Sequence, residues 1–249
     1  MGELIVRAEH ITKSYRKISG FHVKESKVLD DASIHIHRGD IYGFVGVNGA
    51  GKTTLMRVIT GLCRPQSGEI ELFGGQNCQR SRMGGIIEAP AFYPYMTARE
   101  NLRLCQIMRE KERSDQEIDD LFSMTGLDEY DTEKLKAGKF SLGMKKRLGL
   151  AMALLGEPEF LFLDEPLNGL DPIGIENFHE LIRKLNREKH MTILISSHLL
   201  RNLEQVATCY GFIHQGKMLK EISAADLNEK GKIETYFADL IGKNKRGDL

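Results

Sequence analysis

The repeat of apolar positions changes along the chain and separates a strand-rich beginning from a helical middle. Apolar residues alternate or cluster as in β-strands over Leu4–Val6, Val28–Ile36 and Ile41–Val45. The stretch Arg16–Lys27 is polar and irregular, which predicts a surface loop. A Ser-Gly turn precedes a fourth apolar run, Ile70–Phe73, so the first part of the chain is predicted to be rich in strands.

From about residue 90 to 155 the apolar repeat lengthens from two to about three and a half residues. Thr97 and Ser114 each stand three residues before a glutamate, which is the capping-box pattern at the start of a helix. We expect the first helix to end near Met108 and the second near Gly126. This region is longer than a single crossover between strands needs, so it predicts an inserted helical subdomain.

Strand and helix patterns alternate again after the helical region. Phe160–Leu163 predicts a buried strand followed by two acids, and Thr192–Ser197 predicts another that ends at His198. Between them, Asp171 and the proline after it predict a helix that runs to about Glu188. Such alternation indicates a parallel sheet, whose ligands collect at the carboxyl ends of the strands.

The sequence of the last part of the chain gives few predictions about function. An edge strand is expected over Lys217–Ile222, and a short helix is expected to open at Ser223. The basic stretch Lys243–Arg246 is typical of a solvated chain end.

A glycine-rich stretch after Ile41–Val45 matches the phosphate-loop pattern G-x-x-x-x-G-K-[ST]. Its glycines permit positive φ and close approach of consecutive N–H groups to phosphate oxygens at a helix N-terminus. Lys52 is expected to reach the β- and γ-phosphates of a nucleotide, and the Thr53 hydroxyl to take a position on magnesium. A plain turn between a strand and a helix is the simpler interpretation, but the full pattern favours phosphate binding. The predicted loop residues are Gly46, Val47, Asn48, Gly49, Ala50, Gly51, Lys52, Thr53 and Thr54.

The two acids after the strand Phe160–Leu163 complete a candidate catalytic set. Asp164 can hold the magnesium directly or through water, and Glu165 is placed to polarise the attacking water. An Asp-Glu pair at a strand end is more often a turn than a site. The phosphate loop in the same chain favours the site.

Composition excludes several other classes. The 249 residues carry 35 Lys plus Arg and 35 Asp plus Glu, so there is no global electrostatic footprint for nucleic acid or an anionic membrane. The four cysteines are scattered without C-x-x-C spacing, which is typical of reduced cytosolic thiols. No secretion signal is expected, and no run approaches the ~20 apolar residues of a spanning helix, so a membrane role is expected to need a partner.

Five further stretches, taken with the loop and the acid pair, resemble one family. They are Tyr15, Ile86–Pro90, Phe140–Met144, Leu167–Asp171 and Ser196–His198. Their order and spacing resemble the nucleotide-binding domain of ATP-binding cassette (ABC) transporters.

The resemblance implies an α/β fold. It consists of a phosphate-loop NTPase (RecA-like) core with an N-terminal antiparallel β-subdomain and an inserted α-helical signature subdomain. The domain is expected over residues 3–222, with its core at 3–89 and 156–222 and the helical subdomain at 90–155. Residues 223–249 are expected to form a short C-terminal helical extension or tail.

The same resemblance assigns roles residue by residue. Tyr15 is similar to the aromatic residue that stacks on adenine, although a tyrosine at the end of a strand is usually structural. Ser141 and Gly143 fall in the family signature, which binds the γ-phosphate of ATP held by the opposite subunit. Asp171 resembles the aspartate at the subunit junction, and His198 the histidine that contacts the γ-phosphate.

Catalysis in this family implies two such domains, arranged head to tail with ATP and Mg²⁺ between them. The second domain is expected to be another copy of this chain or a close relative. Hydrolysis is expected to drive a separate transmembrane permease, with this chain peripheral on the cytoplasmic face of the cell membrane. No nucleic-acid partner is expected.

Two positions depart from the family pattern. Leu142 and Met144 replace a glycine and a glutamine of the signature, so a polar contact is lost there. Glu88 stands where most members have glutamine, and its carboxylate can still ligate Mg²⁺.

Glu88 and the residues around it resemble the bacitracin and lantibiotic branch, which exports peptide antibiotics or protects against them. The alternative is a soluble cassette ATPase that acts on ribosomes or DNA without a permease.

Two other classes of phosphate-loop protein are disfavoured. A GTPase is disfavoured because Asn244–Gly247 fails the Asn-Lys-x-Asp motif at its last position. A regulator that binds ATP without hydrolysis is disfavoured because the phosphate-loop lysine, the acid pair and the histidine are all present. The sequence leaves open the substrate and the direction of transport.

Overall fold

The structure, a computed structural model, describes residues 2–19, 22–75, 80–110 and 112–246. Contacts within the chain divide it into two units. The first, called unit 1, combines Met1–Cys78 with Thr192–Leu249, and the second, unit 2, is Gln79–Met191.

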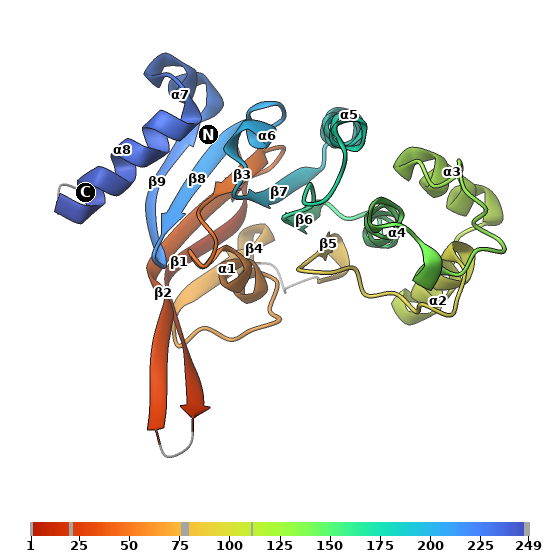
Figure 1. The fold of residues 1–249 in the computed structure, drawn as a ribbon, viewed down its shortest axis with the longest axis horizontal. Coiled ribbons are helices and arrows are strands. Elements are labelled where there is room, and N and C mark those ends of the chain that lie inside the picture. The colour runs from red at the N-terminus through yellow and green to blue at the C-terminus, as the bar shows by residue number, and fades with distance from the viewer. Residues whose placement is uncertain (1, 20–21, 76–79, 111, 247–249) are drawn as a thin grey trace. The chain divides into compact units, whose positions relative to one another are not determined.

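Unit 1 contains an antiparallel sheet with the order β2-β1-β4. Strand β1 is Leu4–Ser19, β2 is His22–His37 and β4 is Ser67–Leu72. Strands β1 and β2 form a long hairpin that projects beyond its neighbours in this unit (Figure 1). The prediction of an irregular loop over Arg16–Lys27 was wrong, because the two strands continue pairing through this polar stretch. Backbone hydrogen bonds and an Arg16–Glu25 ion pair join the strands here, so no apolar alternation marks the pairing in the sequence.

The second sheet of unit 1 holds the strand that leads into the phosphate loop. Strand β3, Ile41–Val45, lies between β7, Thr192–Ser197, and β8, Cys209–His214, and both neighbours are parallel to it. Strand β9, Lys217–Ser223, pairs antiparallel to β8 and forms the edge, so the sheet is mixed. Strands β3 and β7 are buried along their whole length, as their continuous apolar runs predict. Strand β8 was not predicted.

Four α-helices complete the described part of unit 1. Helix α1 is Lys52–Ile59, and Thr60 caps it ahead of Gly61, which has a left-handed conformation. Helix α6 is Leu200–Glu204, and α7, Ala224–Lys230, begins at the predicted cap Ser223. Helix α8 is Ile233–Arg246 and includes the basic stretch Lys243–Arg246, in which Lys243 and Arg246 are exposed. A short 3₁₀ turn, Phe73–Gly75, follows β4.

Unit 2 contains a parallel strand pair and a group of helices. Strand β5, Met83–Ile86, follows a 3₁₀ turn at Arg80–Arg82 and pairs with β6, Phe160–Asp164. Helix α5, Pro172–Lys189, begins as predicted, because the Asp171 side chain accepts a hydrogen bond from the Gly174 N–H at 2.9 Å.

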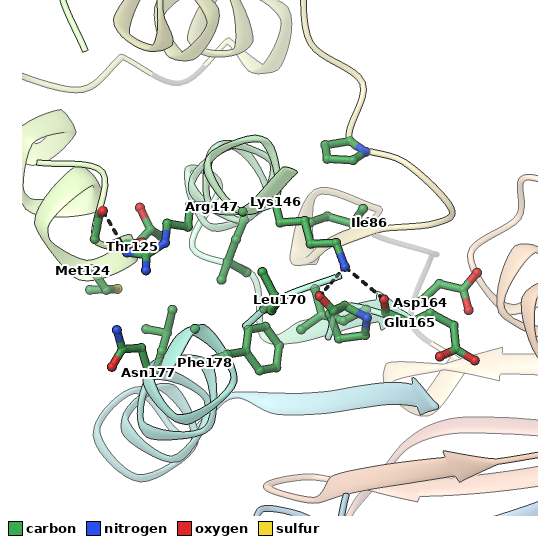
Figure 2. Close-up of a pocket in the computed structure, with 18 of the residues that line it drawn as sticks. Ile86, Met124, Thr125, Lys146, Arg147, Asp164, Glu165, Leu170, Asn177 and Phe178 are labelled. Carbon is green, nitrogen blue, oxygen red and sulfur yellow. Dashed lines mark hydrogen bonds between the residues drawn. The ribbon is translucent and has the colours of Figure 1, made fainter. Parts of the chain in front are cut away.

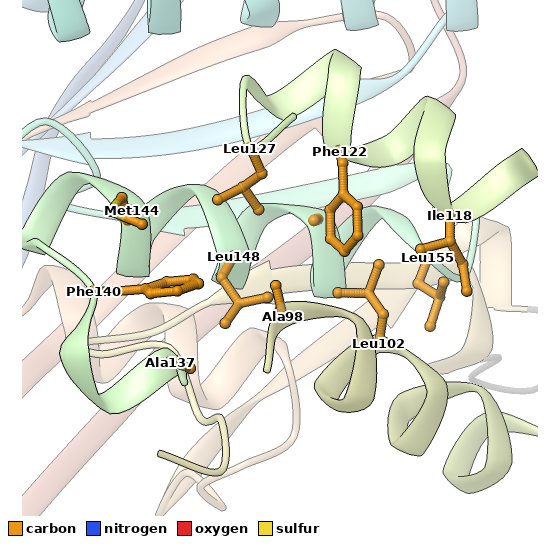
Figure 3. Packing of buried hydrophobic residues seen from close by; sticks show 11 residues of the cluster. Ala98, Leu102, Ile118, Phe122, Leu127, Ala137, Phe140, Met144, Leu148 and Leu155 are labelled. Atoms are coloured by element: carbon orange, nitrogen blue, oxygen red, sulfur yellow. The ribbon is translucent and has the colours of Figure 1, made fainter. Parts of the chain in front are cut away.

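The helical part of unit 2 has its own apolar core. Helices α2, Ala98–Arg109, and α3, Asp115–Thr125, both begin with the predicted capping boxes. A 3₁₀ turn, Ala137–Lys139, leads to α4, Leu142–Leu154, whose buried side chains face those of α2 and α3 (Figure 3). The cluster includes Ala98, Leu102, Ile118, Phe122, Leu127, Phe140, Met144, Leu148 and Leu155. Within the described ranges, no helix is both long and apolar enough to cross a membrane.

Candidate nucleotide-binding site

The predicted phosphate loop connects β3 to α1 in unit 1. Its exposed tip is Val47–Gly49, and the Ala50 N–H closes a turn by donating to the Val47 carbonyl at 3.1 Å. Gly51 caps α1 with φ of 112°, so the helix starts without a side-chain cap. Helix α1 therefore begins directly after the loop, and the positive end of its dipole favours an anion there.

Glycine is required at the loop positions for two different structural reasons. Gly49 and Gly51 have positive φ, as predicted. Gly46 does not, and the expectation of positive φ there was wrong. Gly46 instead provides close approach, because a Cβ at this position would lie 2.7 Å from Ile213 Cγ2. A side chain at Gly46 would therefore displace the loop from strand β8.

Lys52 turns its ammonium group back over the loop. The side chain is buried, and its Nζ donates to the Gly46 carbonyl at 2.6 Å and lies 3.4 Å from the Val47 carbonyl. The lysine therefore places a positive charge next to the loop backbone. This arrangement fits a site for the phosphates of a nucleotide.

His198 shares the edge of the sheet with the phosphate loop. Val45 and Ser197 are direct neighbours in the parallel pair of β3 and β7. Gly46 and His198 each follow the paired residue of their own strand, and His198 is half-buried. The sequence prediction that this histidine lies at the loop's end of the sheet is confirmed.

Tyr15 lies within β1 and not at a strand end. Its ring is 40% exposed, and the Lys13 Nζ lies 5.4 Å from the ring centroid. The hydroxyl is 3.8 Å from the Sγ of Cys63, a residue that follows α1. Tyr15 therefore belongs to the same unit as the loop and presents an aromatic surface to solvent.

In unit 2, three predicted carboxylates lie where β5 and β6 end. Ile86 pairs with Leu163, and Glu88 and the Asp164-Glu165 pair follow within two residues. Asp164 is only 6% exposed, and Glu165 has a left-handed backbone with φ of 47°. A left-handed glutamate is sterically unfavourable, so the surrounding residues must hold it.

A cavity of about 240 Å³ lies beside these carboxylates within unit 2 (Figure 2). Glu88, Asp164, Glu165 and the signature residue Gly143 all line it. The rest of the wall combines apolar side chains, among them Leu150, Leu163 and Phe178, with polar and charged ones, among them Glu129, Lys146, Arg147 and Asn177. The structure thus brings four predicted site residues to one cavity.

The signature residues lie at the start of α4. Ser141 is the exposed N-cap, and its hydroxyl accepts a hydrogen bond from the Met144 N–H at 3.2 Å. Leu142 is 54% exposed and lies over Gly169, where a Cβ would collide with it. Met144, in contrast, is buried in the apolar cluster of unit 2, so the residue that replaces the usual glutamine has a packing role.

The predicted site residues therefore fall into two groups, one in each unit. Unit 1 holds Tyr15, His198 and the loop Gly46–Thr54, including Thr53 as a predicted magnesium ligand. Unit 2 holds Glu88, Ser141, Gly143, Asp164, Glu165 and Asp171.

Two basic residues of α4 were missed in the sequence. Lys146 donates hydrogen bonds to the loop that follows Glu165. Arg147 donates to the Gly126 carbonyl at 2.9 Å and so satisfies the end of α3. The basic run that follows Met144 was the available signal, but only the tertiary structure shows what each side chain contacts.

The strand, the glycine loop with its buried lysine and the helix N-terminus define a phosphate-loop nucleotide-binding domain. Residues 29–168 match the family model described as ABC transporter. The chain belongs to the ABC transporter family, as the sequence motifs predicted. It is an ATP-binding subunit of an ABC transporter, and the activity of this family is ATP hydrolysis.

Named relatives cover nearly the whole chain. The bacitracin transport ATP-binding protein BcrA of Bacillus licheniformis is 44% identical over 247 residues, which are 97% of this chain and 76% of the relative. The lantibiotic transport ATP-binding protein SrtF of Streptococcus pyogenes is 39% identical over 245 residues, covering 97% of this chain and all of the relative. The chain is thus homologous to bacitracin and lantibiotic transport ATPases.

Solved structures confirm the predicted fold class. An ATP-binding subunit of an ABC transporter matches with a TM-score of 0.77 and 26% identity, covering 95% of this chain and 99% of that one. The dimeric post-hydrolysis state of the cassette MJ0796, bound to ADP and phosphate, matches with a TM-score of 0.74 and 22% identity, covering 88% and 98%. The fold is the ABC cassette fold, with its N-terminal antiparallel sheet and its phosphate-loop NTPase core.

Proposed function

We propose that this chain powers a separate transmembrane permease that exports, or protects the cell against, a peptide antibiotic of the bacitracin or lantibiotic type. The observation that carries this proposal is the similarity over nearly the full length to bacitracin and lantibiotic transport ATPases. The chain would be peripheral, on the cytoplasmic face of the cell membrane. The permease would hold the substrate site.

ATP binding is assigned first to unit 1. The amides of the loop Gly46–Thr54 and the ammonium of Lys52 hold the β- and γ-phosphates, because they combine a helix N-terminus with a fixed positive charge. Tyr15 stacks on adenine, a role supported by its exposed ring. His198 contacts the γ-phosphate from the same edge of the sheet.

Magnesium is assigned to Thr53, Asp164 and Glu88. These are oxygen donors, the ligand type that Mg²⁺ prefers, and Asp164 and Glu88 lie at the same edge of the β5–β6 pair. When bound, Mg²⁺ would neutralise charge on the phosphates. Glu165 acts as the catalytic residue that polarises the attacking water.

The remaining assignments require a second cassette, either another copy of this chain or a close relative. Ser141 and Gly143 bind the γ-phosphate of ATP held by the opposite subunit, which suits the exposed Ser141 and the partly exposed Gly143 at the N-terminus of α4. Asp171 lies at the subunit junction. The cassette MJ0796 is dimeric, which supports the pairing of two cassettes.

Unit 2 has an exposed apolar surface, which supports the proposal that a permease binds this chain. On unit 2, Tyr93 is 54% exposed, Tyr95 88% and Met108 71%. Tyr93 and Met108 line one cavity of about 270 Å³, together with Phe92 and Leu104. Contiguous exposed apolar side chains of this kind mark protein-binding surfaces.

A susceptibility assay tests the substrate class. Deletion of the gene should lower the bacitracin or lantibiotic concentration that stops growth, and the wild-type chain should restore it. Lys52→Ala should not restore it, since it removes the phosphate-binding ammonium. Unchanged susceptibility to both antibiotic types would contradict the assigned substrate class.

A further inference from the structure

Lys146 connects helix α4 to the loop that carries Glu165. Its Nζ donates to the Pro166 carbonyl at 2.7 Å and to the Glu165 carbonyl at 3.4 Å (Figure 2). It also donates to the Asn168 carbonyl. An ammonium group has three donors, so one side chain uses all of its hydrogen-bonding capacity on a segment of four residues. Lys146 lies only five residues after the signature serine, Ser141.

The segment that Lys146 contacts has an irregular backbone. Glu165 and Gly169 both have positive φ, of 47° and 75°. Glycine adopts this conformation freely, whereas glutamate does so only when its surroundings hold it. Two local turns fix the rest of the segment, since Asn168 N–H donates to the Glu165 carbonyl and Leu170 N–H to the Leu167 carbonyl. Lys146 adds three hydrogen bonds from outside the segment.

Lys146 makes these hydrogen bonds from a half-buried position. Its side chain lines the cavity of unit 2 together with the apolar Leu150 and Leu163 and the charged Glu129 and Arg147. Burial lowers the pKa of Lys146, while the negative charge of Glu165 acts in the opposite direction. Hydrogen bonds from a charged donor are stronger than those between neutral groups.

We propose that Lys146 is a positioning residue, which fixes the backbone of Glu165 relative to the signature helix so that the carboxylate is aimed at the attacking water. The proposal rests on the catalytic role proposed above for Glu165. In this proposal Lys146 acts through the backbone of Glu165 and not on the nucleotide. Its loss should therefore lower the rate of the chemical step and leave ATP affinity largely unchanged, because small misplacements of a catalytic group cost rate.

The test compares three substitutions at Lys146 with a control. Lys146→Met keeps the length and apolar stem but removes all donors, Lys146→Gln keeps an amide donor, and Lys146→Arg keeps the charge. The control is Lys184→Met, at an exposed lysine of α5 in the same unit. Each full-length variant is assayed for kcat and KM of ATP hydrolysis, for equilibrium ATP binding and for thermal unfolding.

The proposal expects Lys146→Met to lower kcat about ten-fold or more, with ATP affinity within about three-fold of wild type. Lys146→Gln and Lys146→Arg should recover part of the rate, and Lys184→Met should match wild type. If Lys146→Met does not fold, the test rests on Lys146→Gln, for which kcat should fall at least about three-fold at unchanged affinity.

Two results would overturn the proposal. One is a kcat of Lys146→Met within about two-fold of wild type. The other is a parallel loss of kcat, ATP affinity and melting temperature, which would indicate a purely structural lysine. Glu165→Gln, assayed alongside, separates the two proposals. If Glu165→Gln hydrolyses ATP at the normal rate, the catalytic role of Glu165 fails, whereas normal Lys146→Met with inactive Glu165→Gln contradicts only the role of Lys146.

Discussion

At the scale of single residues, Glu165 carries the sharpest prediction. It follows the buried strand β6 in a left-handed conformation, at the edge where Asp164 also lies. Glu165→Gln is nearly isosteric but cannot polarise water as a base. We expect ATP binding to persist, turnover to fall about 100-fold or more, and an ATP-dependent dimer to accumulate. Hydrolysis assays and size-exclusion chromatography measure this, and an unchanged rate would show that another residue positions the water.

Glu88 gives a second prediction at this scale. Its carboxylate replaces the glutamine that most ABC cassettes have, and both side chains offer an oxygen ligand to Mg²⁺. Glu88→Gln should therefore keep nucleotide affinity within a few-fold of wild type, measured by titration with and without Mg²⁺. A collapse of the magnesium-dependent part of binding would show instead that the charge of Glu88 is required.

Residues whose type and spacing are dictated by a chemical function were the easiest to predict. The loop Gly46–Thr54 was found because phosphate binding dictates glycine, lysine and threonine at set spacings. The reason for Gly46 was wrong, since its contact with Ile213 on β8 is tertiary. Lys146 was missed for the same kind of reason, because its partners lie about 20 residues away in sequence.

At the scale of elements, the start of α4 shows how the altered signature affects packing. Met144 is 8% exposed and lies in the cluster with Phe140 and Leu148 (Figure 3). Met144→Gln would restore the usual family residue but bury an amide among apolar groups. We expect it to lower the free energy of unfolding by about 1–3 kcal/mol, measured by denaturant unfolding.

The matched control for Met144→Gln is Ile107→Gln on α2. Ile107 is 74% exposed, so this change should stay within about 0.5 kcal/mol of wild type. Equal stability of Met144→Gln and wild type would show that the start of α4 accommodates a polar side chain, contrary to the packing described here.

A second element-scale prediction concerns the junction between the two sheets of unit 1. His35 on β2 lies with Nδ1 2.8 Å from Glu221 on β9 and with Nε2 3.4 Å from Glu9 on β1. Burial alone lowers the pKa of His35, but the hydrogen bonds and charges of Glu221 and Glu9 outweigh it, and the net result is a raised pKa. The protonated imidazole is therefore favoured in the folded chain.

Because the folded pKa is raised, the stabilisation is fully present below the ordinary histidine pKa of about 6.5 and is lost as pH rises through the folded value. His35→Gln should thus destabilise most below this pH, and the difference from wild type should shrink at higher pH. The pH-dependent part should be about 1 kcal/mol or less, since the ring is partly exposed to solvent. Unfolding curves across this range that differ by a constant amount would contradict the prediction.

Helices with strong local sequence signals were predicted better than strands whose position depends on pairing with another strand. The capping boxes at Thr97 and Ser114 located the starts of α2 and α3 because the cap is made by residues three apart. The outer part of the β1–β2 hairpin was missed because its polar residues carry no alternating pattern. Strand β8 was missed although its run is largely buried.

At the scale of the whole molecule, the central claim is that this ATPase subunit works with a separate permease. The most direct measurement is to tag the chain in its own cell, solubilise the membranes gently and identify what co-purifies. The account predicts a polytopic permease in stoichiometric amount.

Two matched variants sharpen this measurement. Met108→Glu places a charge in the exposed apolar surface of unit 2, and Leu62→Glu changes an equally exposed residue of unit 1, since both are 71% exposed. Met108→Glu should lose the permease and keep ATP binding, whereas Leu62→Glu should keep the permease. Recovery of ribosomal or DNA-bound proteins with no permease would contradict the transport function and favour a soluble cassette ATPase.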